Sequence, residues 1–115
     1  MGESREDRVK MAFELKRFSP ECLPINILNP RPGTPLEHAP KLSPDEILKT
    51  VAVYRFILPE SNIKLAGGRE LNLGTEQDKA LLGGANGLIV GGYLTTAANP
   101  VGDDLAMLRR TGYEV

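Results

Sequence analysis

The amino-acid sequence predicts an α/β protein with a parallel sheet. Three observations favour this class: helical hydrophobic patterns alternate with short β-rich runs, prolines and glycines fall at the turns between them, and the segments number about three strands and four helices in βα order. The composition, with 41% hydrophobic and 25% charged residues, is ordinary for a globular protein. A chain of 115 residues can fold as one domain.

The first helix is expected over about residues 4–18, with Ser4 as its N-cap. Its apolar stripe is formed by Val9, Ala12, Phe13 and Leu15. A strand follows at about 22–28, where the apolar residues suit an interior strand of a parallel sheet. Asn26 is the one polar side chain in this run and needs a partner if it is buried. That partner is either the protein itself or a ligand.

A proline-rich loop separates this strand from the second helix. Prolines at positions 30, 32 and 35 restrict the backbone of the loop at 29–42, so it holds its shape before a ligand binds, as the rim of an active site would. Ser43, Pro44 and Glu46 then predict a helix start with a capping box. Apolar residues continue at helical spacing until Pro59.

The second half of the chain contains two further short strands and two helices. Residues 62–65 form a strand that leads into a glycine-containing loop at 66–75, and a helix follows Thr75. The last strand is expected at 87–90. A terminal helix at 103–110 places Leu105 and Leu108 inward. The first helix has no strand before it, so the pattern predicts a piece of a larger fold.

Charge and hydropathy exclude several classes of function. The net charge is −1 and no basic cluster is visible, which argues against nucleic acid as a partner. No apolar run approaches the roughly 20 residues that span a bilayer, and the charged opening is no signal peptide. We therefore expect a cytoplasmic protein that does not bind membranes.

Three segments in order carry a resemblance to a known family: PINILNPRPGTPLE, IKLAGGRE and GANGLIVGGYLTT. They resemble the closing part of biotin synthase, whose biotin and thiamin synthesis associated region would span about residues 21–115. The resemblance implies the C-terminal portion of a (β/α)8 barrel of the TIM type. Such a barrel needs about 250 residues, so residues 1–115 are expected to be a C-terminal fragment that forms an incomplete barrel.

The resemblance also implies a chemistry. The family belongs to the radical S-adenosylmethionine enzymes and is a sulfurtransferase that inserts sulfur into dethiobiotin to form biotin. It uses S-adenosylmethionine, a 4Fe-4S cluster and an auxiliary 2Fe-2S cluster, and it works as a homodimer. The CxxxCxxC loop that binds the first cluster is absent here, and Cys22 is the only cysteine. We therefore expect the isolated chain to be inactive and assign no catalytic residue to it. Cys22 is interpreted as a small buried hydrophobe.

Residues of the family pocket map onto this chain. By resemblance, Asn26 contacts both S-adenosylmethionine and dethiobiotin, Ile27 forms an apolar wall for the cofactor, and Thr96 binds the ureido end of dethiobiotin. Each has a simpler interpretation: Asn26 as a structural amide, Ile27 as a core residue and Thr96 as a turn hydroxyl.

Lys64 departs from the family pattern, which has at this position an arginine that ligates the auxiliary cluster. A lysine ligates only as a neutral amine, which requires a depressed pKa. Either the cluster differs or the position does not ligate, and the alternative role is a lysine paired with a carboxylate such as Glu70. Arg69 either pairs with Glu70 to hold the loop or faces an anionic group.

Other functions remain open at this point. The glycine-rich segment 84–92 resembles the loop with which many barrels hold a phosphate, so a phosphate-binding half-barrel module is one alternative. Related radical enzymes with the same closing region, of the hydrogenase maturase and methylornithine synthase types, are another. A remnant without activity is the third. An open barrel edge with exposed strands predicts that the isolated chain aggregates, dimerises or stays partly molten.

Overall fold

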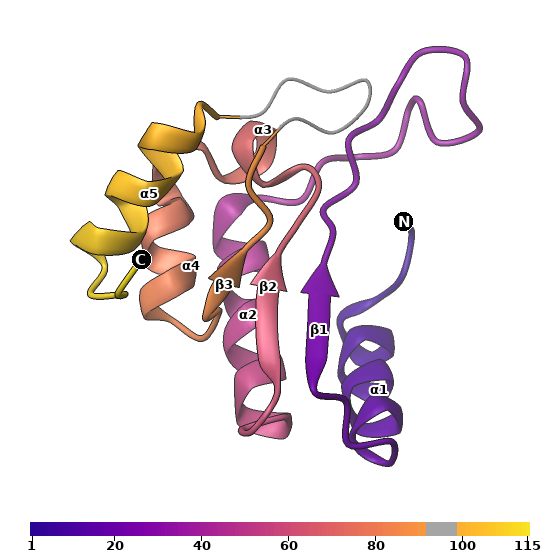
Figure 1. Cartoon of the computed structure of the whole chain (residues 1–115). Helices are drawn as coiled ribbons and strands as arrows, with labels where there is room; N and C mark the ends of the chain where they lie inside the picture. The colour runs from indigo at the N-terminus through magenta and orange to yellow at the C-terminus, as the bar shows by residue number, and fades with distance from the viewer. Residues whose placement is uncertain (92–98) are drawn as a thin grey trace.

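A computed structural model describes residues 1–91 and 99–115. It contains a parallel sheet with the strand order β1-β2-β3, packed against helices (Figure 1). In chain order the elements are α1 (Arg5–Lys16), β1 (Cys22–Ile25), α2 (Pro44–Ile57), β2 (Asn62–Leu65), α3 (Arg69–Leu73), the short 3-10 helix η1 (Gly74–Glu76), α4 (Gln77–Leu82), β3 (Gly87–Leu88) and α5 (Val101–Arg110). The predicted α/β class with three parallel strands is confirmed.

The two faces of β2 have different surroundings. Ile63 and Leu65 are fully buried and belong to one apolar cluster with Val51 of α2 and with residues of α1, α4 and α5. Asn62 is exposed and Lys64 only half-buried on the other face. Alternating side chains of a strand point to opposite faces, so the helices cover one face of β2 while the opposite face stays open.

Helix α1 begins with a reciprocal cap. The Asp7 N–H donates to Ser4 Oγ at 3.1 Å, and the Ser4 N–H donates to Asp7 Oδ2 at 2.9 Å. At the start of α2, Ser43 Oγ accepts from the Glu46 N–H at 3.2 Å. The Glu46 carboxylate, however, does not complete the predicted capping box, because Arg5 and Arg8 of α1 bind it instead. The acid therefore joins two helices.

The buried stripe of α1 is narrower than predicted. Ala12 is fully buried, but Phe13 is 54% exposed and Val9 is 37% exposed. Of the predicted stripe, Ala12 belongs to the apolar cluster and the half-buried Leu15 packs against it, while Arg8 pairs with Glu46 of α2. Large apolar side chains beside these residues therefore reach solvent.

Strand β1 lies at an edge of the described sheet, where the sequence predicted an interior strand over 22–28. It ends at Ile25, because the Ile27 N–H donates to the Gly67 carbonyl at 2.8 Å and the chain turns toward that loop. Cys22 and Pro24 are exposed. The interpretation of Cys22 as a buried hydrophobe is wrong, and a proline without an N–H suits an edge position.

The region after β2 is more helical than the sequence indicated. The predicted loop at 66–75 contains α3 and most of η1, and the helix expected after Thr75 is α4. Helix α3 has only five residues and begins after Gly68, which has φ of +81°. A helix this short lacks the periodic pattern that reveals longer ones.

The last two elements also differ in detail from the prediction. Strand β3 contains only two residues and ends before Ile89. Helix α5 starts two residues earlier than expected, and its most buried side chains are Asp104 and Met107, whereas Leu105 and Leu108 are half-buried. A charged residue therefore occupies the inner face of α5.

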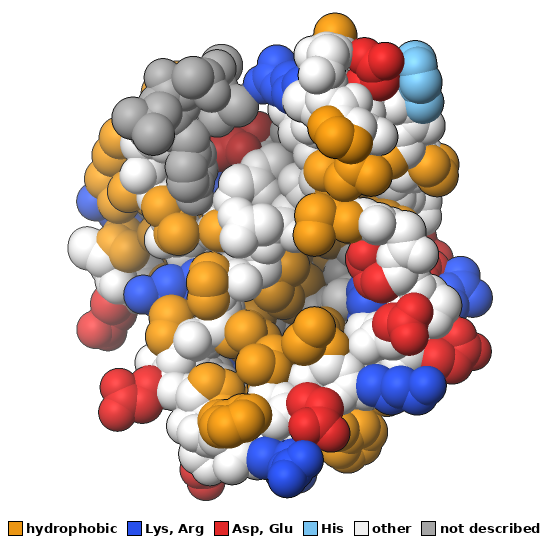
Figure 2. Space-filling model, turned by 90° about the vertical axis from the view of Figure 1, so that its right-hand side faces the viewer, with side chains coloured by type: hydrophobic (Ala, Val, Ile, Leu, Met, Phe, Trp, Pro, Cys, Tyr) orange, Lys and Arg blue, Asp and Glu red, His pale blue; other side chains and the backbone are white. Residues whose placement is uncertain are grey.

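Exposed apolar side chains gather on the side of the molecule seen in Figure 2. Hydrophobic side chains gather in the middle of this view, and charged ones lie mainly around its rim. Over the described part of the chain as a whole, the exposed large apolar residues include Met11, Phe13 and Phe18, at 54–79% exposure. Apolar patches of this kind commonly mark contact surfaces. Among the described residues no helix is long and apolar enough to cross a membrane.

Gly68 should tolerate no side chain. We expect Gly68→Ala to lower the free energy of unfolding by roughly 2–3 kcal/mol, because the added Cβ would lie 2.0 Å from the Ile27 carbonyl oxygen. Gly33→Ala is the matched control, since its φ is +79° but nothing lies within 4 Å of the new Cβ. It should lose only about 1 kcal/mol. Urea denaturation of both variants measures the difference, and equal losses would contradict the close approach.

The pairing of Glu46 with α1 should make the stability depend on pH. Hydrogen bonding by Arg5 lowers the pKa of Glu46 below its ordinary value of 4.5. A lowered pKa in the folded state stabilises the protein above the ordinary value, and this contribution disappears as the pH falls through the lowered pKa.

Unfolding free energies of the parent chain and Glu46→Gln, measured from pH 7 to pH 3, should therefore converge below about pH 4.5. The control is Asp45→Asn, because Asp45 pairs with Lys49 only on the exposed surface of the same helix. A constant gap between the parent and Glu46→Gln would contradict the contribution of the charged carboxylate.

Candidate functional site

The carboxyl ends of the three strands meet at one edge of the sheet, and this edge is the candidate site. In Figure 1 the arrows of β1, β2 and β3 point the same way, toward the loops that follow them. Parallel α/β folds bind ligands at such an edge, with residues that follow each strand. The described residues of these loops lie at 26–43, 66–68 and 89–91.

Asn26 follows β1 directly, and its side chain binds the neighbouring loop. Its Oδ1 accepts a hydrogen bond from the Gly67 N–H at 3.0 Å. A Cβ on Gly67 would lie 3.1 Å from the same oxygen, so the two loops are in close contact. Asn26 is exposed, and its Nδ2 has no hydrogen-bond partner among the described residues. The fold uses the amide oxygen, while contact of the Nδ2 with a ligand stays a prediction.

Ile27 connects the candidate edge to the core. Its N–H binds the Gly67 carbonyl, and its side chain is 7% exposed and belongs to the apolar cluster. Packing of the Ile27 side chain in the core therefore fixes the backbone next to Asn26. Its contact with a cofactor stays a prediction.

Lys64 lies in the middle of the open face. Its neighbours across the sheet are Pro24 on β1 and Gly87 on β3. A Cβ on Gly87 would lie 2.9 Å from Lys64 Cγ, so the glycine leaves room for the lysine stem. Among the described residues Lys64 forms no ion pair, and the expected pairing with Glu70 is wrong because Glu70 lies 3.2 Å from Arg69.

Arg69 forms a buried ion pair with Asp104, a partner that was not predicted from the sequence. Its Nη1 and Nη2 donate to the Asp104 carboxylate at 3.1 and 2.6 Å, and both side chains are fully buried. Gln77 accepts a further bond from Nη1, and the Ile89 carbonyl accepts one from Nη2 at 3.2 Å. The interpretation as an ion pair with Glu70 is confirmed, because Nη2 lies 3.2 Å from Glu70 Oε1, while the partner that buries the guanidinium group is Asp104 of this chain.

Sequence reasoning missed Asp104 as the partner of Arg69. The available signal was its place on the apolar stripe of the terminal helix, three residues before Met107. A carboxylate on such a stripe needs a buried counter-charge. Asn99 Nδ2 also donates to Asp104 Oδ1 at 3.2 Å, so two side chains, Arg69 and Asn99, satisfy this carboxylate with three hydrogen bonds.

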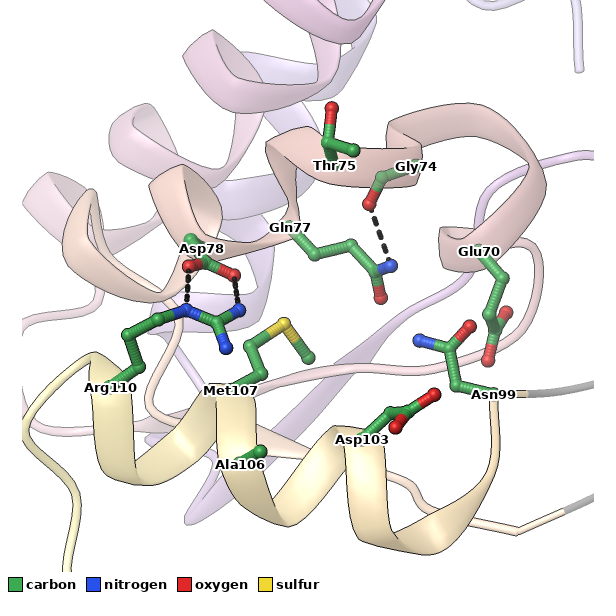
Figure 3. Close-up of a pocket in the computed structure, with 10 residues that line it drawn as sticks. All are labelled: Glu70, Gly74, Thr75, Gln77, Asp78, Asn99, Asp103, Ala106, Met107 and Arg110. Atoms are coloured by element: carbon green, nitrogen blue, oxygen red, sulfur yellow. Dashed lines mark hydrogen bonds and ion pairs between the residues drawn. The ribbon is translucent and has the colours of Figure 1, made fainter.

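A pocket of about 420 Å³ lies between α5 and the segment from α3 to α4 (Figure 3). Asp78 and Arg110 face each other across it, with two hydrogen bonds of 2.8 and 2.9 Å. Bonding by Arg110 lowers the pKa of Asp78. The pocket is lined by Glu70, Gly74, Thr75, Gln77, Asp78, Asn99, Asp103, Ala106, Met107 and Arg110. None of the predicted site residues that the structure describes is among them.

The glycine-rich segment is divided by β3. Its first part precedes β3, at the amino end of the strand. There the Asn86 side chain is hydrogen-bonded to β2. Asn86 Oδ1 accepts from the Ile63 N–H at 2.7 Å, and its Nδ2 donates to Asn62 Oδ1 at 3.1 Å. Of the glycines at the carboxyl end of β3, the structure describes Gly91, with φ of +89°. This arrangement gives the phosphate-binding alternative no specific support.

The remaining predicted site features concern metals and the last loop. Thr96 lies outside the described residues, so its role as a substrate contact stays a prediction. Within the described ranges no group of three or more metal-ligating side chains is found. Cys22 is exposed and unpaired by any disulfide. Iron–sulfur clusters need several thiolates, so these residues do not fit a cluster site.

Comparisons with known proteins agree with the resemblance. The chain is 50% identical to proteins named biotin synthase from Acetivibrio thermocellus and Carboxydothermus hydrogenoformans, over 100% of this chain and 36% and 35% of theirs. The biotin synthase of Gloeothece citriformis is 47% identical over 99% of this chain and 32% of its own length. The chain therefore spans about a third of the length of these relatives.

A family model covers most of the chain. The model of the Biotin and Thiamin Synthesis associated domain matches residues 24–114, which include every described strand exit. The expected resemblance to the C-terminal part of biotin synthase is thus confirmed. The chain belongs to the Biotin and Thiamin Synthesis associated domain family.

Proposed function

We propose that this chain is the closing portion of a biotin synthase and forms part of the wall that holds dethiobiotin. The observation that carries the proposal is the 50% identity to a biotin synthase over the whole chain. The candidate edge adds support, because Asn26 lies there at the exit of β1 and its Nδ2 has no hydrogen-bond partner among the described residues. Polar groups at strand exits are the usual means by which parallel folds orient a small substrate.

The fold is consistent with a sector of a (β/α)8 barrel. In a closed parallel barrel, helices cover the outer face of the strands and the inner face looks into the barrel. The open face of β2 carries Asn62 and Lys64, whereas the covered face carries only apolar side chains. Strand β1 also has a free edge, at which a preceding strand of the parent protein would pair.

The side chains present in this chain indicate which steps it contributes to in the parent enzyme. In the proposed parent enzyme, S-adenosylmethionine and iron–sulfur clusters supply the radical chemistry and the sulfur. The sequence contributes one cysteine, so the cluster ligands are assigned to other parts of the parent. This chain binds and orients the substrate.

Individual residues of this chain have roles in binding and orienting the substrate. Asn26 uses its Nδ2 to donate to a carbonyl or carboxylate of S-adenosylmethionine and dethiobiotin, while its Oδ1 stays bound to Gly67. Ile27 keeps Asn26 in place from the core, and Thr96 contacts the ureido group. In the parent enzyme Lys64 would lie near the auxiliary cluster, whose thiolate ligands would come from other parts of the protein. Its ammonium form has no lone pair for iron, so ligation would require the neutral amine.

A chimeric enzyme tests the proposal directly. The C-terminal third of the Acetivibrio thermocellus biotin synthase is replaced by this chain, and biotin formed from dethiobiotin is measured by mass spectrometry. We expect biotin formation that depends on S-adenosylmethionine. A chimera that folds and shows the visible spectrum of its iron–sulfur clusters, yet forms no biotin, would overturn the proposed function.

The same chimera tests Asn26. Asn26→Ala should lower kcat/KM for dethiobiotin by roughly 10- to 100-fold, because the hydrogen bond from Nδ2 to the substrate is lost. Asn62→Ala is the matched control, since Asn62 is on the same strand face as Lys64 but at the amino end of β2. It should change kcat/KM by less than about threefold. Equal effects of the two variants would remove Asn26 from the substrate site.

A further inference from the structure

The buried ion pair between Arg69 and Asp104 joins the terminal helix to the candidate edge. Both side chains are fully buried, and the two guanidinium nitrogens bind both carboxylate oxygens. Removing two charges from water is costly, and a hydrophobic pair of similar volume often stabilises as well. We propose that Asp104 is a positioning residue, which acts through Arg69 to fix the exits of all three strands. The relevance to substrate rests on the proposed function.

Arg69 reaches the exits of β2 and β3 directly. It follows Gly68 in the loop that leaves β2, and its Nη2 donates to the carbonyl of Ile89, one residue beyond β3. The guanidinium group therefore sets the distance between these two exits. Asp104 holds the guanidinium in place, because its carboxylate occupies both nitrogens that also bind Gln77 and Ile89.

The exit of β1 is connected through the two residues that precede Arg69 in its loop. The Gly67 N–H donates to Asn26 Oδ1 at 3.0 Å, and the Gly67 carbonyl accepts from the Ile27 N–H at 2.8 Å. Gly68 lies so close to Ile27 that a Cβ would reach its carbonyl oxygen. A shift of Arg69 would thus be transmitted to Asn26 over two residues of backbone.

Helix α3 has little stability of its own, so it depends on this anchor. It has five residues, and its N-cap Gly68 supplies no side-chain hydrogen bond. Helices much shorter than about 12 residues are marginal without tertiary contacts. Asn72 donates to the Gly68 carbonyl at 2.8 Å, which closes the turn locally but adds no bond to α5. The bonds of Arg69 to Asp104 therefore supply the polar link to the terminal helix.

A second ion pair links α5 to its neighbour and does not reach the edge. Arg110 binds Asp78 on α4 with two hydrogen bonds, at the opposite end of α5 from Asp104. This pair is partly exposed. Asp78→Asn thus removes a two-bond ion pair of α5 without touching Arg69, which makes it the matched control.

Amide hydrogen exchange of the 115-residue chain, followed by NMR, tests the proposal. In Asp104→Asn we expect the amides of Gly67 and Ile27 to exchange roughly tenfold faster. The Ile63 amide, which donates to Asn86 Oδ1 inside the sheet, should change by less than about threefold. Asp78→Asn should leave Gly67 and Ile27 unchanged.

A second variant covers the case in which Asp104→Asn fails to fold. Arg69→Lys keeps a positive charge beside Asp104 but cannot bind both carboxylate oxygens and Ile89 at once. It should accelerate Gly67 and Ile27 exchange by a smaller factor than Asp104→Asn, again without affecting Ile63.

Three results would overturn the proposal. One is equal acceleration at Ile63, because a purely structural role would lower protection everywhere. Another is unchanged exchange at Gly67 and Ile27 in the folded variants. The third is the absence of protection at these amides in the parent chain. The readout involves no substrate, so a chimera without biotin synthase activity would defeat the proposed function and leave this result standing.

Discussion

The organisation of the candidate edge depends on one guanidinium group. Arg69 is buried without access to water, and its hydrogen-bond acceptors lie on three other parts of the fold: Asp104 on α5, Gln77 at the start of α4 and the Ile89 carbonyl after β3. Arginine suits this place because its planar fork can serve several acceptors in fixed directions. The apolar cluster holds the helices against the sheet, while Arg69 sets where the loops above them lie.

The sheet itself is asymmetric, because one face is buried under the helices and the other is open. Ile63 and Leu65 are packed into the apolar cluster, so their positions are decided by burial. Lys64 lies between them in sequence but on the open face. Its neighbours across the sheet there are Pro24 and Gly87. Residues on that face are free to serve a ligand because the fold does not need them for its core.

Much of the fold could be predicted from the sequence, since strong local signals mark α2, β2 and the parallel order of the strands. Ser43 with Pro44 specified the start of α2, and long apolar periods specified its length. The candidate site was less accessible. Asn26 and Lys64 were identified by resemblance, but the Arg69–Asp104 pair joins residues 35 positions apart, and no local pattern reports such a contact. Helix α3 was missed because five residues carry no period.

Pro24 removes one hydrogen-bond donor from the outer edge of β1 in the described sheet. The Ile25 carbonyl accepts a bond from Ala66 on the β2 side, so alternate peptide groups, including that of Pro24, face outward. Pro24 has no N–H, and the outward row of donors is therefore interrupted in the middle of the strand. A strand that pairs with this edge must have no backbone acceptor that needs a donor at Pro24. This requirement favours one specific partner strand and disfavours non-specific addition of strands to the sheet.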